Sequence, residues 1–354
     1  MDYKEHFKKE VQNFIFVELE KPLVISLNNV VINLPKGDYP VDSKELINIA
    51  KENKDFTAQS IINGMIFVLG SDSSFPYLEN YINILKKIPN IESYIIFQIE
   101  ENKNKDIKKA IIYTSALIKL NPKKEFQMNR IYLLMDYYQK TNLSFLEAEI
   151  IESLKNLLKQ YPEYEPANFY IAEYYLDKDI DLAKYHLRYC LSSEKYRQKA
   201  EEYLKKIEAV ENYDKAVSLL KEGYPKEALK ILIPYIESNP QNLDAKYYIA
   251  VAYREIGNYQ KALLYLNELL NILETPEVDN EIGLNLAFLG YFEKAIEYFK
   301  KALKFKPSEV SILSNIGVCY FNLNDFENAK KYFKLALDKK PDDEVCKEWI
   351  KRLS

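Results

Sequence analysis

From about residue 58 to residue 341, apolar residues recur three or four positions apart in segments of helix length, and most segments end near Gly, Asn or Pro. This spacing puts the apolar side chains on one face of a helix, which predicts a succession of amphipathic helices. Because the connections between them are short, neighbouring helices should pack as antiparallel pairs. The hydrophobic pattern therefore predicts a mostly α-helical protein.

The first 54 residues follow a different pattern. Asn28-Asn29 separates two apolar runs, Leu23–Leu27 and Val30–Leu34. Asn tolerates the positive φ that a two-residue hairpin turn requires, so we expect a β-hairpin here. A turn is expected at Pro35–Asp38 and a helix over residues 44–53. This small β-containing module either covers the exposed end of the first helix pair or serves as a docking element.

The helical region is periodic. In residues 310–341, small and large residues occupy fixed slots: Leu313, Ile316, Gly317, Tyr320, Ala329, Phe333, Ala336 and Pro341. The slots recur 34 residues earlier at Gly283, Ala295, Phe299, Ala302 and Pro307. Two units further upstream keep part of the pattern, at Tyr253, Ala262, Leu266 and Leu269 and at Ala228, Leu232, Tyr235 and Pro240. A period of this length is typical of helical repeat arrays.

Packing explains these residue types. A small residue at Ala295 or Ala329 lets two helices approach closely, and a larger side chain there would overpack the contact. The aromatic rings of Phe299 and Phe333 are expected to fill the space between units. Gly or Asn ends the first helix of each pair, because both accept the positive φ of a helix C-terminus. Pro ends the second helix, because it disfavours helical geometry in the preceding residue.

These slots match the tetratricopeptide pattern of W-x2-L-G-x2-Y, A-x3-F and P, so the chain resembles the tetratricopeptide repeat (TPR) family. In residues 310–341 the match is Leu313-x2-Ile316-Gly317-x2-Tyr320, Ala329-x3-Phe333 and Pro341. The resemblance is specific from about residue 209 and weaker over residues 58–208. It implies an α-solenoid of helix pairs, A and B, preceded here by the small β-containing module.

We therefore expect three parts. Residues 1–54 form the module with the β-hairpin, and residues 55–208 form a degenerate array with an extra helix at about 192–208. Residues 209–354 form a clear array with a capping helix at 342–354. A stacked array needs a polar-faced cap where stacking stops, and the charged terminal segment has that character. Trp349 is expected to anchor this cap to the last repeat.

Residue usage argues against an enzyme. The chain has 8 Gly without a phosphate-binding loop motif, and its 2 His do not form H-E-x-x-H. None of the 3 Cys forms C-x-x-C, so we expect free, buried thiols in a reducing cytoplasm. No apolar run is long enough to span a membrane. We expect a cytoplasmic, non-catalytic protein with no cofactor, no metal and no direct membrane insertion.

The charge pattern argues against nucleic acid as a partner. The net charge is −4 and is shared evenly between the parts before and after residue 209. Lysine pairs such as Lys300-Lys301 and Lys339-Lys340 have acidic neighbours, which predicts a solvated outer face. Neither half has the positive field that nucleic acid or anionic lipid requires. An RNA-binding helical repeat remains an alternative.

The family resemblance also predicts where a ligand would lie. In the TPR family, ligands usually contact the concave face of helices A, at the second, fifth, ninth, twelfth and thirteenth positions of a unit. Carried over to this sequence, these positions include Tyr247, Val251, Arg254, Asn280, Leu284, Phe288, Ser314, Val318 and Phe321. Arg254 is the sole positive charge, and the Lys, Arg and Asn set of a carboxylate clamp is not found. The aromatic residues favour an apolar or aromatic segment, extended or helical, as the ligand.

The function that the resemblance implies is a protein-interaction scaffold that binds a protein or peptide segment. Three alternatives stay open. A peptide-responsive regulator would need the two arrays to move about residues 192–208, an assembly or secretion cofactor would copurify with membrane complexes, and an enzyme would need a site in the N-terminal module. The sequence indicates neither the partner nor the oligomeric state.

Overall fold

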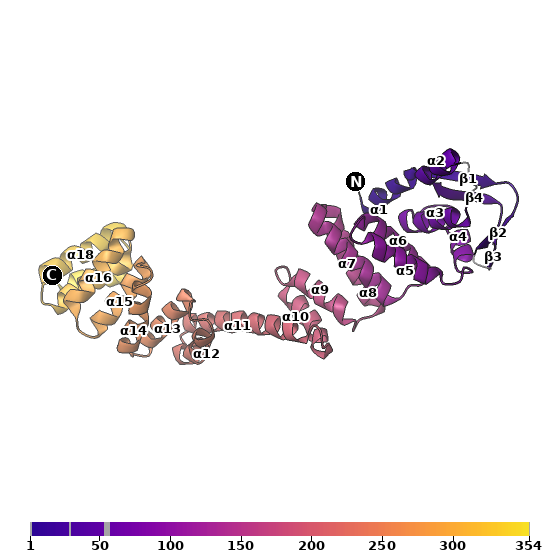
Figure 1. Cartoon of the computed structure of the whole chain (residues 1–354). Coiled ribbons are helices and arrows are strands. Elements are labelled where there is room, and N and C mark those ends of the chain that lie inside the picture. The colour runs from indigo at the N-terminus through magenta and orange to yellow at the C-terminus, as the bar shows by residue number, and fades with distance from the viewer. Residues whose placement is uncertain (1, 28–29, 53–56, 354) are drawn as a thin grey trace. The chain divides into compact units, whose positions relative to one another are not determined.

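The computed structural model describes residues 2–27, 30–52 and 57–353 and is a helical solenoid with a small β-containing region at its N-terminus (Figure 1). It divides into two compact units, Met1–Leu204 and Lys205–Ser354. The division falls inside helix α11 (Arg197–Lys221). The extra helix expected at 192–208 and the first helix of the C-terminal array are therefore one continuous helix, because no helix-breaking residue separates them.

Unit 1 starts with a short helix and two small sheets. The elements are α1 (Tyr3–Lys8), the 3-10 helix η1 (Lys9–Asn13), β1 (Phe14–Leu19), β2 (Leu23–Leu27), β3 (Val30–Leu34), β4 (Gly37–Asp42) and α2 (Ser43–Glu52). Strands β2 and β3 pair antiparallel, with Leu23 opposite Leu34, and the expected turn at Asn28-Asn29 lies outside the described residues. Strands β1 and β4 form the second antiparallel pair, from Phe14 opposite Asp42 to Leu19 opposite Gly37.

Two features of this region differ from the sequence expectation. A turn was expected at Pro35–Asp38, and this prediction is wrong for Gly37 and Asp38. These two residues begin strand β4 and pair with β1. Helix α1 was not expected at all. Asp2 caps it by accepting a hydrogen bond from the Glu5 amide at 2.8 Å, and the helix is held by Phe7, which is buried.

The β-containing region packs against helix α3 (Ala58–Ser71). Val41 of β4 and Leu34 of β3 are fully buried in the same core as Met65 of α3. The closest approach is at Gly64, where a Cβ would lie 1.8 Å from the carbonyl oxygen of Pro40. Only glycine fits there, so β4 lies directly on the α3 backbone and covers that face of the helix.

The rest of unit 1 is a series of packed helices. They are α4 (Leu78–Leu85), α5 (Ile91–Asn102), α6 (Ile107–Leu120), α7 (Lys124–Thr141), α8 (Ser144–Gln160), α9 (Glu165–Tyr175), α10 (Ile180–Tyr189) and the 3-10 turn η2 (Cys190–Ser192). Helices α7 and α8 are long, with Asn142 in the left-handed conformation (φ 53°) at the turn between them.

Unit 2 continues as helix pairs. Its elements after α11 are α12 (Pro225–Ser238), α13 (Leu243–Glu255), α14 (Tyr259–Leu270), α15 (Pro276–Phe288), α16 (Phe292–Phe305), α17 (Val310–Asn322), α18 (Phe326–Lys339) and α19 (Glu344–Arg352). The turns within the pairs hold Gly223, Gly257, Gly290 and Asn324, all with positive φ. This is the turn chemistry that the sequence predicted at the last three of these positions.

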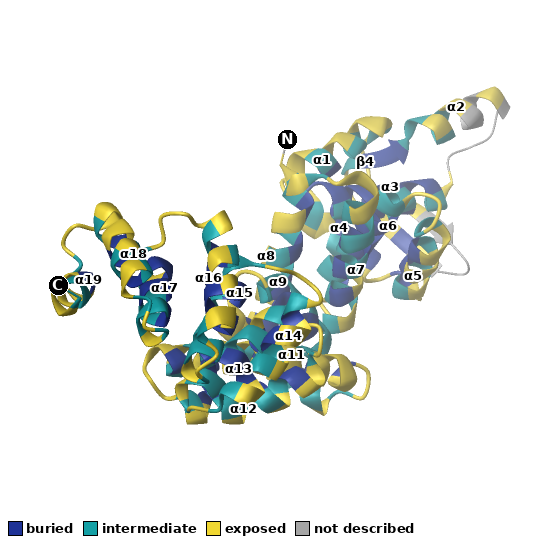
Figure 2. Cartoon of the chain, turned by 90° about the vertical axis from the view of Figure 1, so that its left-hand side faces the viewer, coloured by how far each residue is buried: buried dark blue, intermediate teal, exposed yellow. Residues whose placement is uncertain are grey.

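Each interface between neighbouring helices has its own small core. The last one joins α17, α18 and α19 through Leu313, Ala329, Phe333, Ala336 and Cys346. Phe333 lies against Gly317, where a Cβ would be 2.8 Å from the ring. The large ring and the missing side chain are therefore complementary, as the repeat pattern predicted. In Figure 2, α17 shows mainly buried and intermediate residues, whereas α18 exposes much of its outer face.

Candidate functional site

The predicted partner-binding positions lie on α13, α15 and α17, the first helices of three successive pairs. Helix α15 contacts both α13 and α17, so the three form one row. Phe288 is exposed, and the other eight residues of the predicted set are partly exposed: Tyr247, Val251, Arg254, Asn280, Leu284, Ser314, Val318 and Phe321. The predicted positions therefore lie on three neighbouring helices, and three local contacts change what these positions offer.

The first contact concerns Arg254. Its Nε donates a hydrogen bond to Oε2 of Glu281 in α15 at 2.7 Å. The Glu281 side chain is only 7% exposed. Burial raises the pKa of Glu281, and the charge of Arg254 offsets part of that rise. Burial also raises the pKa of Tyr247, which lies close enough to feel both charges. The positive charge expected to meet a ligand is therefore paired within the chain and links α13 to α15.

The second contact is at the end of the row. The ring of Phe321 packs edge-on against Trp349 of α19, with ring centroids 4.8 Å apart. Ser314 Oγ lies 2.9 Å from the sulfur of Cys346 in the same helix, and Val318 packs on the core that includes Cys346. Trp349 also stacks on Phe333 at 5.5 Å. The terminal helix thus partly covers these three predicted binding residues, and the accessible face centres on α13 and α15.

The third contact supports a ligand at this centre. Phe288 is 60% exposed at the end of α15, and its ring stacks on Tyr259 at the start of α14, with centroids 5.0 Å apart and nearly parallel planes. An exposed ring held by a second ring presents a flat apolar surface that loses little conformational freedom on binding. Partly exposed Val251 and Leu284 occupy the same row. Tyr259 was not selected from the sequence, because its contact crosses between helix pairs.

Helix α15 is unusual in burying polar side chains. Asp279 and Asn285 are fully buried. Neither Asp279 oxygen, nor Asn285 Oδ1, nor Asn280 Oδ1 has a hydrogen-bond partner among the residues that the structure describes. Burial raises the pKa of Asp279. The negative charge of Glu274 raises this pKa further, and the positive charge of Lys301 lowers it. Asp279 stands where Leu313 stands 34 residues later, a departure that a slot-by-slot comparison of the repeats would have detected.

Groups that could perform catalysis are dispersed among the described residues. His6 hydrogen-bonds Tyr137 in unit 1, and His186 hydrogen-bonds Asn168 in another helix pair. The three cysteines are free and buried, and burial raises the pKa of the thiols of Cys190 and Cys319 to about 12. No group of three His, Cys, Asp or Glu residues with metal-ligand placement occurs in the described part of the chain. Over the same residues, none of the helices has the length and apolar character to cross a membrane.

Comparison with known proteins points to one family. Models of the tetratricopeptide repeat match residues 213–275, 280–309 and 310–343. A TPR repeat-containing protein of Methanocaldococcus jannaschii is 45% identical over 56 residues, which is 16% of this chain and 18% of the relative. The match therefore spans less than a fifth of that relative's length.

Solved structures of other proteins are also similar in part. A double mutant of MamA aligns with 17% identity and a TM-score of 0.38, covering 41% of this chain and 82% of the other. YrrB, described as a TPR protein with an unusual peptide-binding site, aligns with 18% identity and a TM-score of 0.38, covering 57% of this chain and 99% of its own. The family models match only unit 2, where the repeat slots are clearest.

Proposed function

We propose that this chain, a tetratricopeptide repeat protein, is a non-catalytic interaction scaffold that holds a partner segment against the face formed by α13 and α15. The observation that carries the proposal is the exposed ring of Phe288, held by its stack on Tyr259. A ring fixed in this way offers contact area without an ordering cost, which is how aromatic anchors act in protein interfaces.

The composition of the face suggests the chemistry of the ligand. Val251, Leu284 and Phe288 supply apolar contacts, whereas Arg254 is already neutralised by Glu281. A ligand with an anionic terminus would find no free positive charge among the predicted binding residues, so the face suits an apolar or aromatic segment. Three free, buried thiols support a reducing, cytoplasmic setting.

A matched pair of variants tests this proposal. Phe288→Ala removes the exposed ring at the centre of the face, and Phe305→Ala removes a ring of similar exposure, 58% against 60%, at the end of α16. The intact protein and both variants would be used for affinity capture from the native lysate, with quantitative mass spectrometry. We expect Phe288→Ala to lose a defined set of proteins that Phe305→Ala retains. Equal recovery with both variants would place the binding surface elsewhere.

A further inference from the structure

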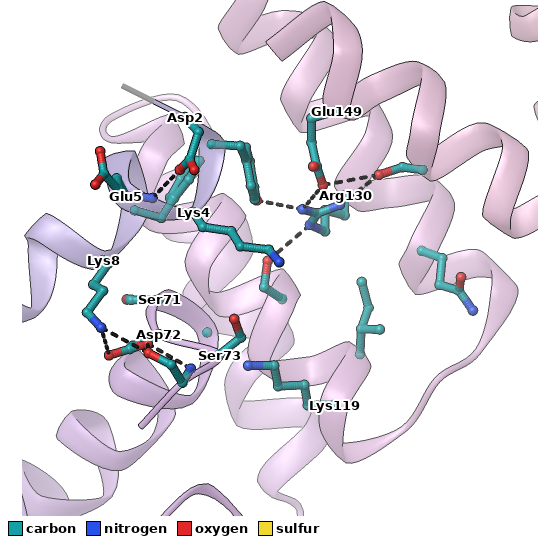
Figure 3. Close-up of a pocket in the computed structure, with 18 of the residues that line it drawn as sticks. Asp2, Lys4, Glu5, Lys8, Ser71, Asp72, Ser73, Lys119, Arg130 and Glu149 are labelled. Atoms are coloured by element: carbon teal, nitrogen blue, oxygen red, sulfur yellow. Dashed lines mark hydrogen bonds and ion pairs between the residues drawn. The ribbon is translucent and has the colours of Figure 1, made fainter. Parts of the chain in front are cut away.

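A second site lies in unit 1, away from the repeats that the family models match. A cavity of about 590 Å³ is enclosed by α1, the end of α3, and α6, α7 and α8 (Figure 3). Sites for small organic ligands usually have volumes of roughly 300–1,000 Å³. Because residues from five helices converge on it, the cavity is a feature of the tertiary structure and not of any one repeat.

Half of the eight charged residues that line the cavity form ion pairs with one another. Arg130 of α7 donates hydrogen bonds to Glu149 at 2.7 Å, to Tyr3 at 2.5 Å, and to the hydroxyl oxygens of Ser115 and Ser153, each at 3.1 Å. At the other side, Lys8 of α1 contacts Asp72 at 3.2 Å and Ser74 at 2.9 Å. The Arg130–Glu149 pair and the Lys8–Asp72 pair are each neutral. They build the wall of the cavity and leave little capacity for a ligand.

Two ammonium groups lack a carboxylate partner. Lys4 of α1 makes no hydrogen bond or ion pair with any residue that the structure describes. Lys119 of α6 donates one hydrogen bond, to the backbone carbonyl of Leu69 at 2.7 Å, and pairs with no carboxylate in the described part of the chain. Figure 3 shows both side chains reaching into the cavity, whereas the carboxyl group of Glu5 points away from it. Lys4 and Lys119 are therefore the two cations of the lining that no carboxylate contacts among the described residues. The lining as a whole is balanced, because four basic and four acidic residues surround the cavity.

The remaining wall is mixed: Phe7, Ile118 and Ile131 give it an apolar part, and Gln127, Asn156 and several serines give it a polar part. Burial lowers the pKa of Lys119, with a further contribution from Arg130, while Asp72 opposes the shift. A partly buried ammonium without a counter-ion is costly, and a bound anion would offset that cost.

We propose that this cavity binds a small organic phosphate, with Lys4 and Lys119 contacting the phosphate group and the apolar part of the wall contacting the organic part. A phosphate monoester carries about −1.5 to −2 charge at neutral pH, which matches two unpaired ammonium groups. Lys4 belongs to α1 and Lys119 to α6, so the ligand would bridge the N-terminal helix to the array. This site is independent of the partner-binding face in unit 2.

A structural role for Lys119 is the competing explanation, since its hydrogen bond to Leu69 also satisfies a carbonyl at the C-terminal end of α3. Lys4 has no such role, because its side chain is exposed and contacts no described partner. Lys4→Met therefore separates ligand binding from folding, and Lys119→Met is the second variant. Lys87→Met is the matched control, because the Lys87 side chain is also exposed and contacts no described partner but does not line the cavity.

Isothermal titration calorimetry with glycerol 3-phosphate, inorganic phosphate and succinate tests the proposal on the full chain. We expect saturable binding of glycerol 3-phosphate, weaker binding of inorganic phosphate and still weaker binding of succinate. Lys4→Met and Lys119→Met should each weaken glycerol 3-phosphate binding about tenfold, the effect of one charge-assisted contact. Lys87→Met and Phe288→Ala should bind as the unmodified protein does.

A second readout is hydrogen exchange of the α1 amides, which bound glycerol 3-phosphate should slow because it bridges α1 to α6. The proposal is overturned if no saturable heat appears at about 10 mM ligand, where a millimolar site would be largely filled. It is equally overturned if Lys87→Met weakens binding as much as Lys4→Met, which would indicate diffuse charge attraction, or if succinate binds as well as glycerol 3-phosphate.

Discussion

Replacing Asp279 by Leu should stabilise the protein at neutral pH. Asp279 is fully buried, and neither of its carboxyl oxygens has a hydrogen-bond partner in the described part of the chain. The corresponding position of the next repeat is Leu313, which is 5% exposed. Leaving a buried polar group unsatisfied costs roughly 1–3 kcal/mol. A leucine of larger volume recovers apolar burial but introduces some overpacking, so we expect a net gain of about 1–2 kcal/mol.

The gain should depend on pH in a defined direction. Burial raises the pKa of Asp279 above its ordinary value of 3.8, so the folded protein binds this proton more tightly than the unfolded chain does. The stability associated with the protonated carboxyl group is fully present below that ordinary value and is lost as the pH rises through the raised pKa. Asp279→Leu should therefore stabilise more at pH 7 than at about pH 4.

Urea denaturation followed by far-ultraviolet circular dichroism at the two pH values measures this effect. The slope of the unfolding free energy against urea concentration (m) should be the same for all variants. Asp279→Asn separates the charge from the polarity, because it removes ionisation but keeps a polar group. Leu313→Asp is the reciprocal control and should destabilise by about 3 kcal/mol or more, because it introduces an unpaired buried carboxylate. An Asp279→Leu protein that is no more stable at pH 7, or gains the same amount at both pH values, would refute the reasoning.

Three further predictions concern unit 2. Phe333→Ala should lower the free energy of unfolding by about 3–5 kcal/mol, because the fully buried ring packs on Trp349; a loss below about 1 kcal/mol in chemical denaturation would contradict this. Arg254→Ala should cost about 2–3 kcal/mol because it leaves Glu281 buried and unpaired, and a double-mutant cycle with Glu281→Leu should recover most of that loss. Gly290→Ala should lower the thermal midpoint, because φ at this turn is 83° and a side chain there costs roughly 1–2 kcal/mol; an unchanged midpoint would show that the turn relaxes.

The helix pairs of unit 2 could be predicted from the sequence for a physical reason. Ala295, Ala329, Phe299 and Phe333 are all buried, as their slots required. Each slot describes a contact between helices that are adjacent in the chain, so its demand for a small or large side chain is visible in the local sequence. The N-terminal region has no such period, and α1 was missed because its stability comes from contacts with distant helices, such as that of Tyr3 with Arg130.

The sequence alone determined the periodic helical hairpins and the residue types that join them, and it predicted the row of helices on which a partner would lie. Only the tertiary structure decided which of those surface positions are accessible. Arg254 is paired with Glu281 of the following helix pair, and Phe321 lies against Trp349 of the terminal helix. Such contacts depend on the rotation between successive pairs and on the reach of each side chain, and neither is expressed in the period of the sequence.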